Sequence, residues 1–293
     1  MPIYLPNPTP EVWAQSALHF EERWAFPNCV GAVDGKHIVI EAPKHGGSMF
    51  YNYKGSHSIV LMAVADASYK FLYVDIGAYG SQSDGGIFKA CTLGRDLEAG
   101  GLGLPPPRRL PGSSLEAPYV FVGDEAFQLR PDFMRPFPGT DLDDTKRVYN
   151  IRLSHARRCV ENAFGILASR WRIFRRPLNV KVENVELLVQ ASIVLHNFLR
   201  AQEEAAPGGE TYCPPGFADR RCNAGGAEDG EWRQMLARNP ACALGDLTAT
   251  LARRFSREAA NVRSVFAEFF SSEAGAEEWQ WEKAGARRPH KDV

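Results

Sequence analysis

Three acidic side chains occupy positions from which a folded chain could bring them to one catalytic site. Asp34 interrupts an otherwise apolar run, and Asp124 directly follows a second one, YVFVG. Glu161 lies in a stretch whose apolar side chains recur with helical spacing. Because an isolated ionised carboxylate is costly to bury, we expect Asp34 to have a compensating partner. Asp124 would emerge at the end of a strand, where open α/β sheets place their sites.

Carboxylates delivered from two strands and one helix fit a site for Mg²⁺ or Mn²⁺, hard cations that take oxygen ligands. Two such ions can activate an attacking water or 3′-hydroxyl and stabilise the leaving oxygen of a phosphodiester. Spacing alone leaves other interpretations open. Asp66 and Asp75 also lie on strand-like runs, and Asp84 is equally explained as a helix N-cap. Glu161 could instead form a surface pair with Arg157, one helical turn before it.

The elements that must position these acids alternate between strand and helix patterns. Runs that are apolar on both faces predict a covered central sheet. The predicted strands are residues 29–41, 58–66, 70–78 and 119–123. The predicted helices are residues 11–24, 87–97, 154–171, 182–202 and 247–270. The pattern therefore indicates an α/β fold.

Composition shifts divide the chain into four parts. Proline-rich residues 1–27 form a lead-in, and residues 28–200 hold the strands and the acids in one main domain. Residues 201–246 have the composition of an acidic linker, and residues 247–293 return to a helical segment and a polar tail.

The overall composition excludes several classes of protein. With 44% hydrophobic and 24% charged residues, the 293-residue chain has the balance of a globular protein. No run approaches the roughly 18 apolar residues of a membrane span, so we expect no membrane partner. The six cysteines form no CxxC pair, which argues against a zinc module and a dense disulfide framework and favours the cytosol or nucleus.

The formal net charge of −1 hides an asymmetry. Residues 130–181 hold twelve Lys or Arg against five Asp or Glu, a balance of +7, whereas residues 201–250 hold four against eight, a balance of −4. A basic block of this kind can contact phosphates while the acidic block keeps the total near zero.

Six ordered blocks of sequence carry a resemblance to a known family. They are GAVDGKHI (31–38), YNYKGSHSIVLMAVAD (51–66), GSQSDGGIF (80–88), VGDEAFQL (122–129), YNIRLSHARRCVENAFGILASRWRI (149–173) and VLHNFLR (194–200). In order and spacing they resemble the Harbinger transposase family and its domesticated relatives, the Harbinger-derived nucleases and the antagonist-of-heterochromatin-protein-like plant proteins. The resemblance covers about residues 28–200, and residues 261–281 more weakly resemble the family's C-terminal helix.

The resemblance implies an RNase H-like fold: a mixed sheet flanked by helices, here with a C-terminal helical extension. It makes residues 28–200 a DDE endonuclease domain in which Asp34, Asp124 and Glu161 are the first, second and third catalytic acids. Asp84 matches a further family aspartate and is expected as a fourth metal-site residue, with Mg²⁺ or Mn²⁺ as the cofactor. Glu125 departs from the small residue that the family often has there, which adds negative charge beside the site.

DNA is the partner that the resemblance implies. Side chains expected to contact its phosphates are Lys36, Arg152, Arg157, Arg158, Arg170 and Arg172. Harbinger elements are mobilised together with a separate Myb-like DNA-binding protein, so the resemblance also implies such a partner and a nuclear location. A homo-oligomer is a further partner to be considered.

The alternative hypothesis is a domesticated, catalytically silent transposase that acts as a nuclear DNA- or chromatin-associated interaction protein. The intact acids favour the active nuclease. Only about 28 residues precede the first predicted strand, too few for the helix-turn-helix segment that family transposases usually carry, and this favours the silent protein. A metal-dependent phosphatase would also cluster acids, but the basic block and the six ordered blocks favour a nuclease.

Overall fold

A mixed sheet forms the centre of the molecule in the computed structural model, which describes residues 4–43, 46–82, 84–206, 211–221, 227–238, 242–246 and 255–288. Its strands are β1 (Cys29–Ile40), β2 (His57–Ala65), β3 (Phe71–Tyr79), β6 (Val120–Val122), β7 (Phe133–Met134) and β10 (Leu244–Asp246). They lie in the order β3-β2-β1-β6-β7, and β10 pairs with β1. Strands β1, β2 and β3 pair antiparallel, whereas β6 is parallel to both β1 and β7.

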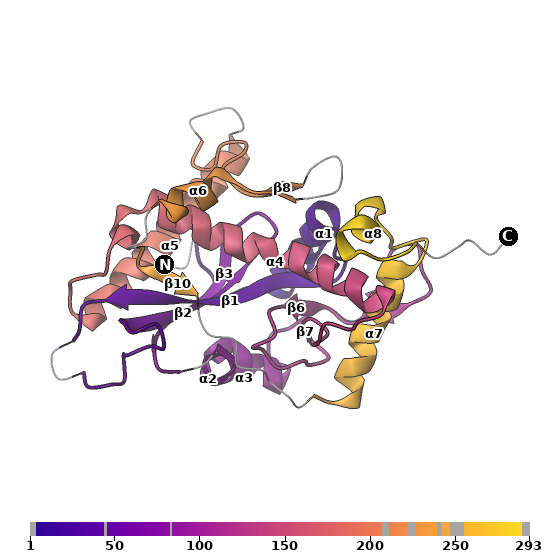
Figure 1. Ribbon diagram of the computed structural model, residues 1–293, viewed down its shortest axis with the longest axis horizontal. Coiled ribbons are helices and arrows are strands. Elements are labelled where there is room, and N and C mark those ends of the chain that lie inside the picture. The colour runs from indigo at the N-terminus through magenta and orange to yellow at the C-terminus, as the bar shows by residue number, and fades with distance from the viewer. Residues whose placement is uncertain are drawn as a thin grey trace.

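Helices cover both faces of this sheet, as Figure 1 shows. They are α1 (Pro10–Trp24), α2 (Asp84–Ala90), α3 (Thr92–Ala99), α4 (Asp144–Arg170), α5 (Val182–Ala205), α6 (Glu231–Ala237), α7 (Arg257–Ser271) and α8 (Glu278–Ala284). The smaller elements are β4 (Arg108–Arg109), β5 (Glu116–Ala117), β8 (Arg220–Arg221), β9 (Ala227–Glu228) and the 3₁₀ turn Arg172–Arg175. None of the described helices is long and apolar enough to cross a membrane.

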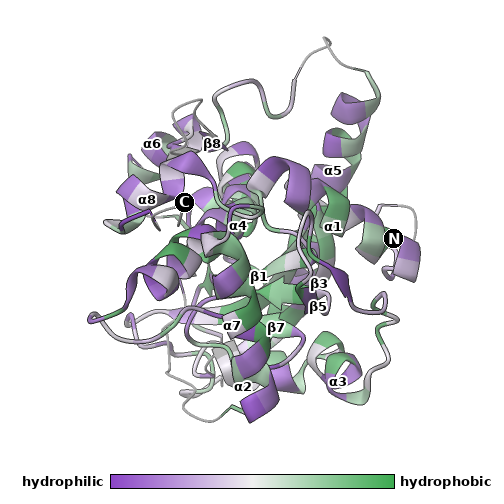
Figure 2. Cartoon of the chain, turned by 90° about the vertical axis from the view of Figure 1, so that its right-hand side faces the viewer, coloured by the Kyte–Doolittle hydropathy of each residue, from purple (hydrophilic) through white to green (hydrophobic). Residues whose placement is uncertain are grey.

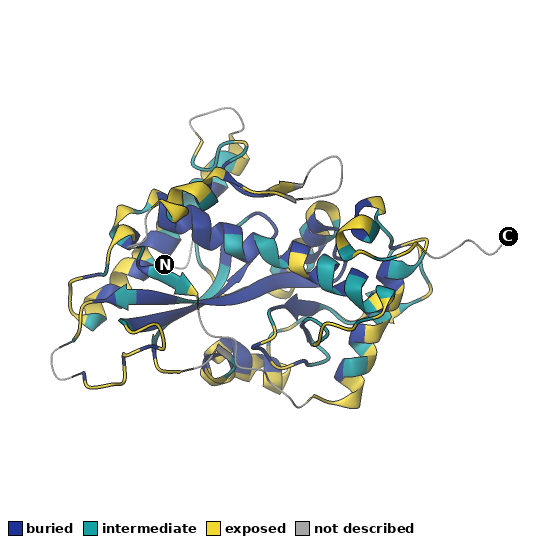
Figure 3. Cartoon of the chain, in the orientation of Figure 1, coloured by how far each residue is buried: buried dark blue, intermediate teal, exposed yellow. Residues whose placement is uncertain are grey.

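The two faces of the sheet carry separate apolar layers. Ala32 and Ile38 of β1 belong to the layer under α4, whereas Val30 and Val33 belong to the layer under α2 and α3. In Figure 3, β1 and β2 are almost wholly buried while the outer faces of the helices are exposed. The predicted α/β class, with a mixed sheet flanked by helices, is confirmed.

Helix α4 spans 27 residues and crosses the sheet from one side of the molecule to the other. The sequence pattern predicted that it begins near residue 154, but it begins at Asp144. The reason is a cap: the Asp143 carboxylate accepts a hydrogen bond from the Lys146 backbone N–H at 2.9 Å. The added turns bury Val148 and Tyr149 in the same core.

The C-terminal helices pack against the first half of α4. Arg152 of α4 is only 2% exposed and lies among them. Its guanidinium donates to the Gly275 carbonyl at 2.9 Å, to Gln280 Oε1 at 2.7 Å and to the Ala25 carbonyl. The predicted C-terminal helical extension is therefore present, and a buried charge joins it to the central domain. In Figure 2, α7 carries both hydrophobic and hydrophilic residues.

The segment 201–246 contributes regular structure although its composition predicted a linker. Helix α5 continues to Ala205, and β10 pairs antiparallel with β1. Trp232 of α6 packs against α4 at Gly165, where a Cβ atom would lie 2.2 Å from the indole. Only glycine at position 165 admits this contact, so α6 sits directly on α4.

Candidate active site

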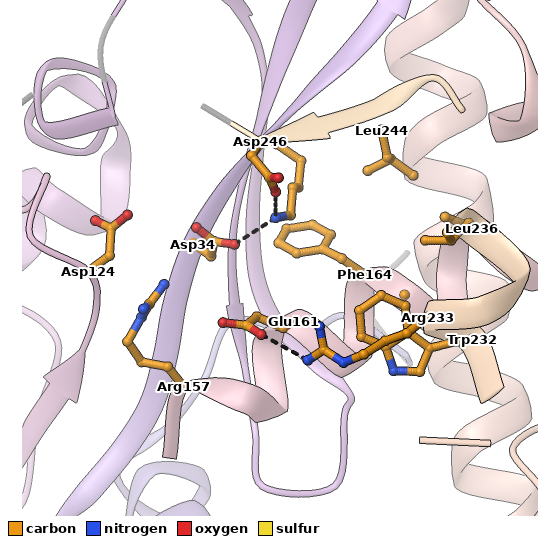
Figure 4. Close-up of a pocket in the computed structure, with 13 residues that line it drawn as sticks. Asp34, Asp124, Arg157, Glu161, Phe164, Trp232, Arg233, Leu236, Leu244 and Asp246 are labelled. Carbon is orange, nitrogen blue, oxygen red and sulfur yellow. Dashed lines mark hydrogen bonds and ion pairs between the residues drawn. The ribbon is translucent and has the colours of Figure 1, made fainter. Parts of the chain in front are cut away.

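A cavity of about 470 Å³ opens between β1, α4, α6 and β10. It contains all three acids that the sequence predicted, Asp34, Asp124 and Glu161 (Figure 4). Two strands and one helix deliver them, because β1 and β6 are adjacent parallel strands and α4 crosses above. Residues that are far apart in the sequence thus meet at one site.

Asp34 and Lys36 share one face of β1 because alternate residues of a strand point the same way. The Asp34 carboxylate is 7% exposed, and its Oδ2 lies 3.1 Å from the Lys36 ammonium. Lys36 also pairs with Asp246 of β10, directly across the strand pair. Burial lowers the pKa of Lys36, but the charges of Asp34 and Asp246 raise it above its ordinary value. The expected partner of Asp34 is therefore a lysine two residues along the chain.

Asp124 follows β6, and its Oδ1 accepts a hydrogen bond from the Ala126 backbone N–H at 2.9 Å. This bond turns the chain at the strand end and directs the carboxylate into the cavity. Burial raises the pKa of Asp124; the Arg157 charge opposes the rise and the Asp34 charge adds to it.

Glu161 reaches the cavity from α4, where its Oε2 accepts from Arg233 Nη2 at 3.1 Å. Arg233 belongs to α6 and also binds Asp219, with 2.6 Å between Nη2 and Oδ2. Asp219 has no exposed side-chain surface and holds Arg158 as well, at 3.2 Å. The Glu161 carboxylate is therefore joined to a buried ion-pair network.

Arg157 lies one turn before Glu161 and lines the same cavity. Figure 4 shows its guanidinium pointing toward the space between Asp34 and Asp124. Its Nε is buried and has no hydrogen-bond partner among the residues that the structure describes. A guanidinium in this position has donors available for a ligand.

The structure separates the remaining predicted residues. Arg152 was predicted to contact DNA, and this is wrong, because its buried guanidinium is bonded to backbone carbonyls and Gln280. Arg158 forms ion pairs with Asp219 and Asp229 beside the cavity, and the Arg170 guanidinium lies 4.1 Å from the Phe217 ring centre.

Two further predictions end differently. Arg172 is exposed on the turn after α4, so its predicted phosphate contact stays a prediction. Asp84 begins α2, but its side chain lies outside the described residues. Among the acids left open by spacing, Asp66 accepts hydrogen bonds from the Ser68 and Lys70 backbones, so it organises a turn.

Three side chains at the cavity were missed by sequence reasoning: Trp232, Arg233 and Asp246. All three come from the segment with linker composition, and they reach the cavity only through long-range packing. A tryptophan in a polar, glycine-rich segment was the one available signal, since such a side chain usually needs a buried surface.

The three carboxylates of Asp34, Asp124 and Glu161 line one cavity, and carboxylate oxygens are the type of ligand that Mg²⁺ and Mn²⁺ prefer. Within the described part of the chain, however, no three acidic, histidine or cysteine side chains form a group that could hold a metal ion as they stand. Lys36 and Arg233 neutralise two of the acids instead. A metal would compete with these cations for the carboxylate oxygens.

Sequence comparison identifies the family of the chain. Residues 33–197 match the family described as DDE superfamily endonuclease. The chain is 28% identical over 194 residues to Protein ALP1-like of Arabidopsis thaliana, covering 63% of this chain and 46% of that protein. It is 27% identical over 219 residues to Protein Antagonist of Like Heterochromatin Protein 1 of the same plant, covering 69% and 52%.

An animal relative extends the comparison. The human protein named "Putative nuclease HARBI1" is 26% identical over 177 residues, covering 59% of this chain and 46% of that protein. The chain thus matches about half the length of these curated relatives. No solved structure matches it significantly.

Proposed function

Because the chain belongs to the DDE superfamily endonucleases, we propose that it cuts DNA phosphodiester bonds with divalent metal ions bound by Asp34, Asp124 and Glu161. The observation that carries the proposal is the meeting of these three acids in one cavity. All three positions lie within residues 33–197, the range of the family match. We propose Mg²⁺ or Mn²⁺ as the metal.

The bound metal would activate a water or hydroxyl and stabilise charge on the leaving oxygen. The chain's own side chains supply the rest of the site. Arg157 has the planar fork that binds two phosphate oxygens at once, and it points into the cavity. Lys36 adds a positive charge beside Asp34. Together they would hold the scissile phosphate against the acids.

DNA would approach over the basic surface that borders α4. Arg172 is exposed at the end of this helix, and Arg158 and Arg170 lie along it. Such contacts bind phosphates and position the duplex without reading its sequence. We propose that target choice is left to a separate Myb-like DNA-binding protein, and that the protein acts in the nucleus.

Nicking of a supercoiled plasmid tests the proposal. Wild type should nick the plasmid in Mg²⁺ or Mn²⁺ and not in EDTA, whereas Asp34→Asn and Glu161→Gln should lose at least about a thousandfold in rate. Glu258→Gln, an exposed acid on α7, is the matched control and should cut like wild type. Equal nicking rates for wild type and both cavity variants would show that Asp34 and Glu161 are not catalytic residues.

A silent DNA- or chromatin-associated protein is the second candidate. The ion pairs Lys36–Asp34 and Arg233–Glu161 favour it, because they occupy the carboxylates that a metal would need. The name of one plant relative calls it an antagonist of Like Heterochromatin Protein 1. No cleavage in either metal, together with retained DNA binding, would support this second function.

A further inference from the structure

The guanidinium of Arg233 on α6 is held on one side by a buried carboxylate. Its Nε donates to Asp219 Oδ1 at 2.9 Å, and its Nη2 donates to Asp219 Oδ2 at 2.6 Å. The Asp219 side chain has no exposed surface, and a paired contact of this kind fixes the plane of the guanidinium. Arg233 is therefore held in one orientation, although its own side chain is 30% exposed.

The residues that hold Arg233 are attached to the middle of α4. Asn162 is fully buried and directly follows Glu161 in the sequence. Its Oδ1 accepts from the Asp219 backbone N–H at 2.9 Å and from the Trp232 indole N–H at 2.7 Å. The Gly230 backbone N–H also donates to Asp219 Oδ1, at 2.8 Å. These bonds fix the first turn of α6 beside Glu161.

The remaining donors of the Arg233 guanidinium lie at the candidate active site. Arg233 lines the cavity, and its Nη2 also donates to Glu161 Oε2 at 3.1 Å. Its Nη1 forms no hydrogen bond with any residue that the structure describes. In Figure 4, Arg157 and Arg233 lie on opposite sides of Glu161. One guanidinium thus binds a buried anchor and a proposed catalytic acid and still has an unused donor.

The two ion pairs of Arg233 differ in how easily they can be exchanged. The Glu161 side chain is 31% exposed, and an ion pair this accessible contributes little stability. The Asp219 side chain is fully enclosed, so its pair with Arg233 would remain. If Glu161 gave its oxygens to a metal, Arg233 would keep its position. Its Nη1 and the second hydrogen of Nη2 would then be available to another oxygen anion.

We propose that Arg233 exchanges Glu161 for a non-bridging oxygen of the scissile phosphate when metal is bound. The inference rests on the proposed nuclease function. In the metal-free protein Arg233 neutralises Glu161, and in the metal-bound protein it contacts the DNA backbone. The planar guanidinium suits a phosphate, whose oxygens accept from neighbouring donors. The contact between Arg233 and DNA therefore depends on metal.

Binding of a fluorescent duplex oligonucleotide to the full chain tests this exchange. The affinity is measured in EDTA and in Ca²⁺, which takes oxygen ligands and replaces the proposed cutting metal. In EDTA, Arg233→Gln should bind the duplex within about twofold of wild type, because Glu161 already occupies the arginine. In Ca²⁺, the variant should bind roughly tenfold more weakly than wild type, because the phosphate contact is lost.

Metal binding without DNA gives a second measurement. Calorimetric titration should show that Arg233→Gln binds Mn²⁺ roughly fivefold more tightly than wild type, because no cation competes for Glu161. Arg158→Gln is the matched control. Arg158 belongs to the same network through Asp219 and Asp229, and its substitution leaves the pair of Arg233 with Glu161 in place. This control should bind Mn²⁺ like wild type.

A conservative variant separates the exchange from a loss of folding. Arg233→Lys keeps the positive charge but lacks the planar guanidinium. It should bind Mn²⁺ like wild type and recover only part of the duplex affinity in Ca²⁺. Full recovery by Arg233→Lys would show that charge alone is needed and would overturn a directed contact with the phosphate.

The outcomes distinguish this inference from the proposed function. If wild type nicks DNA but both Arg233 variants bind the duplex equally in EDTA and in Ca²⁺, the exchange is excluded and the nuclease remains. Mn²⁺ affinity that is unchanged in Arg233→Gln would also exclude it. Wild type that neither binds Mn²⁺ nor nicks DNA would overturn the proposed function and the exchange together.

Discussion

Helix α4 holds arginines in two contrasting environments. Arg152, in its first half, is enclosed, and its guanidinium is bonded to the backbone at Ala25 and Gly275 and to Gln280. Arg157, little more than one turn later, lines the cavity, and its guanidinium points toward the space between Asp34 and Asp124 (Figure 4). An arginine whose donors are used by its own protein stabilises the fold, whereas one with donors to spare is available to a ligand.

The acids repeat this contrast. Asp219 has no exposed side-chain surface and accepts from Arg233, Arg158 and the Gly230 backbone N–H. Asp124 accepts a hydrogen bond from the Ala126 backbone N–H, and burial is the main cause of its raised pKa. Asp219 thus belongs to an enclosed ion-pair network, whereas Asp124 faces the cavity.

The largest expected effect is on the closed side of the comparison. Arg152→Ala should lower the free energy of unfolding by roughly 3 kcal/mol or more, because it leaves several buried acceptors unsatisfied. Urea unfolding measures this loss, with Arg257→Ala on the exposed face of α7 as the control. If Arg152→Ala is as stable as wild type and binds DNA poorly, Arg152 is a DNA-binding residue and not a structural one.

On the open side, Arg157→Ala should leave stability within about 0.5 kcal/mol of wild type. Its cleavage rate should fall about a hundredfold, since one phosphate-binding donor set is removed from the site. The salt dependence of DNA binding should lose roughly one unit of slope. Arg157→Lys keeps the positive charge but lacks the planar guanidinium. It should restore the salt dependence of DNA binding but not the full cleavage rate. Stability loss without a change in rate would place Arg157 among the packing residues.

An intermediate effect is expected where α6 meets α4. Gly165→Ala should cost about 2 kcal/mol, because the new methyl group overlaps the Trp232 indole. In a double-mutant cycle, Trp232→Ala should remove most of this cost. Tryptophan fluorescence and urea unfolding provide the measurements, and additive free energies would show that α6 does not rest on residue 165.

A gradual effect should follow pH. Burial lowers the pKa of His196 to about 4, and its ring nitrogens bond to the Tyr69 carbonyl and the Tyr212 hydroxyl. The unfolded chain takes up a proton below about pH 6.5 while the folded protein does not, so stability is lost as pH falls from about 6.5 to 4. The slope should approach about 1.4 kcal/mol per pH unit for this histidine. His196→Gln should reduce the dependence of the free energy of unfolding on pH. An unchanged slope would show that His196 does not cause this dependence.

The smallest effect is expected at Asp124, where a substitution should raise the free energy of unfolding. Because the pKa of Asp124 is raised in the folded protein, its stability contribution is lost as pH rises through that pKa, and the ionised form opposes folding at pH 7. Without metal, Asp124→Asn should raise the free energy of unfolding by less than about 1 kcal/mol at pH 7, and the gain should vanish near pH 4. Calorimetry at the two pH values measures the difference; destabilisation at pH 7 would show that the carboxylate supports the fold.

Local sequence predicted the parts of this molecule that depend on local pattern. Apolar runs identified β1, β2 and β3, and the acids placed on or after such runs meet in the cavity. Neighbouring arginines on α4 could not be told apart, because their environments depend on which distant segment packs over each one. Arg233 and Asp246 were missed for the same reason.

The return of residues 231–246 to the cavity has a consequence for how the protein can be divided. The family match ends at residue 197, yet the wall opposite Glu161 and the strand that pairs with β1 come from beyond it. A protein fragment that ends at residue 197 would lack β10 and α6. It would expose the edge of β1 and the apolar surface around Gly165, and both surfaces would promote aggregation. The segment of the gene that must stay together to encode a complete site is therefore longer than the region by which the family is recognised.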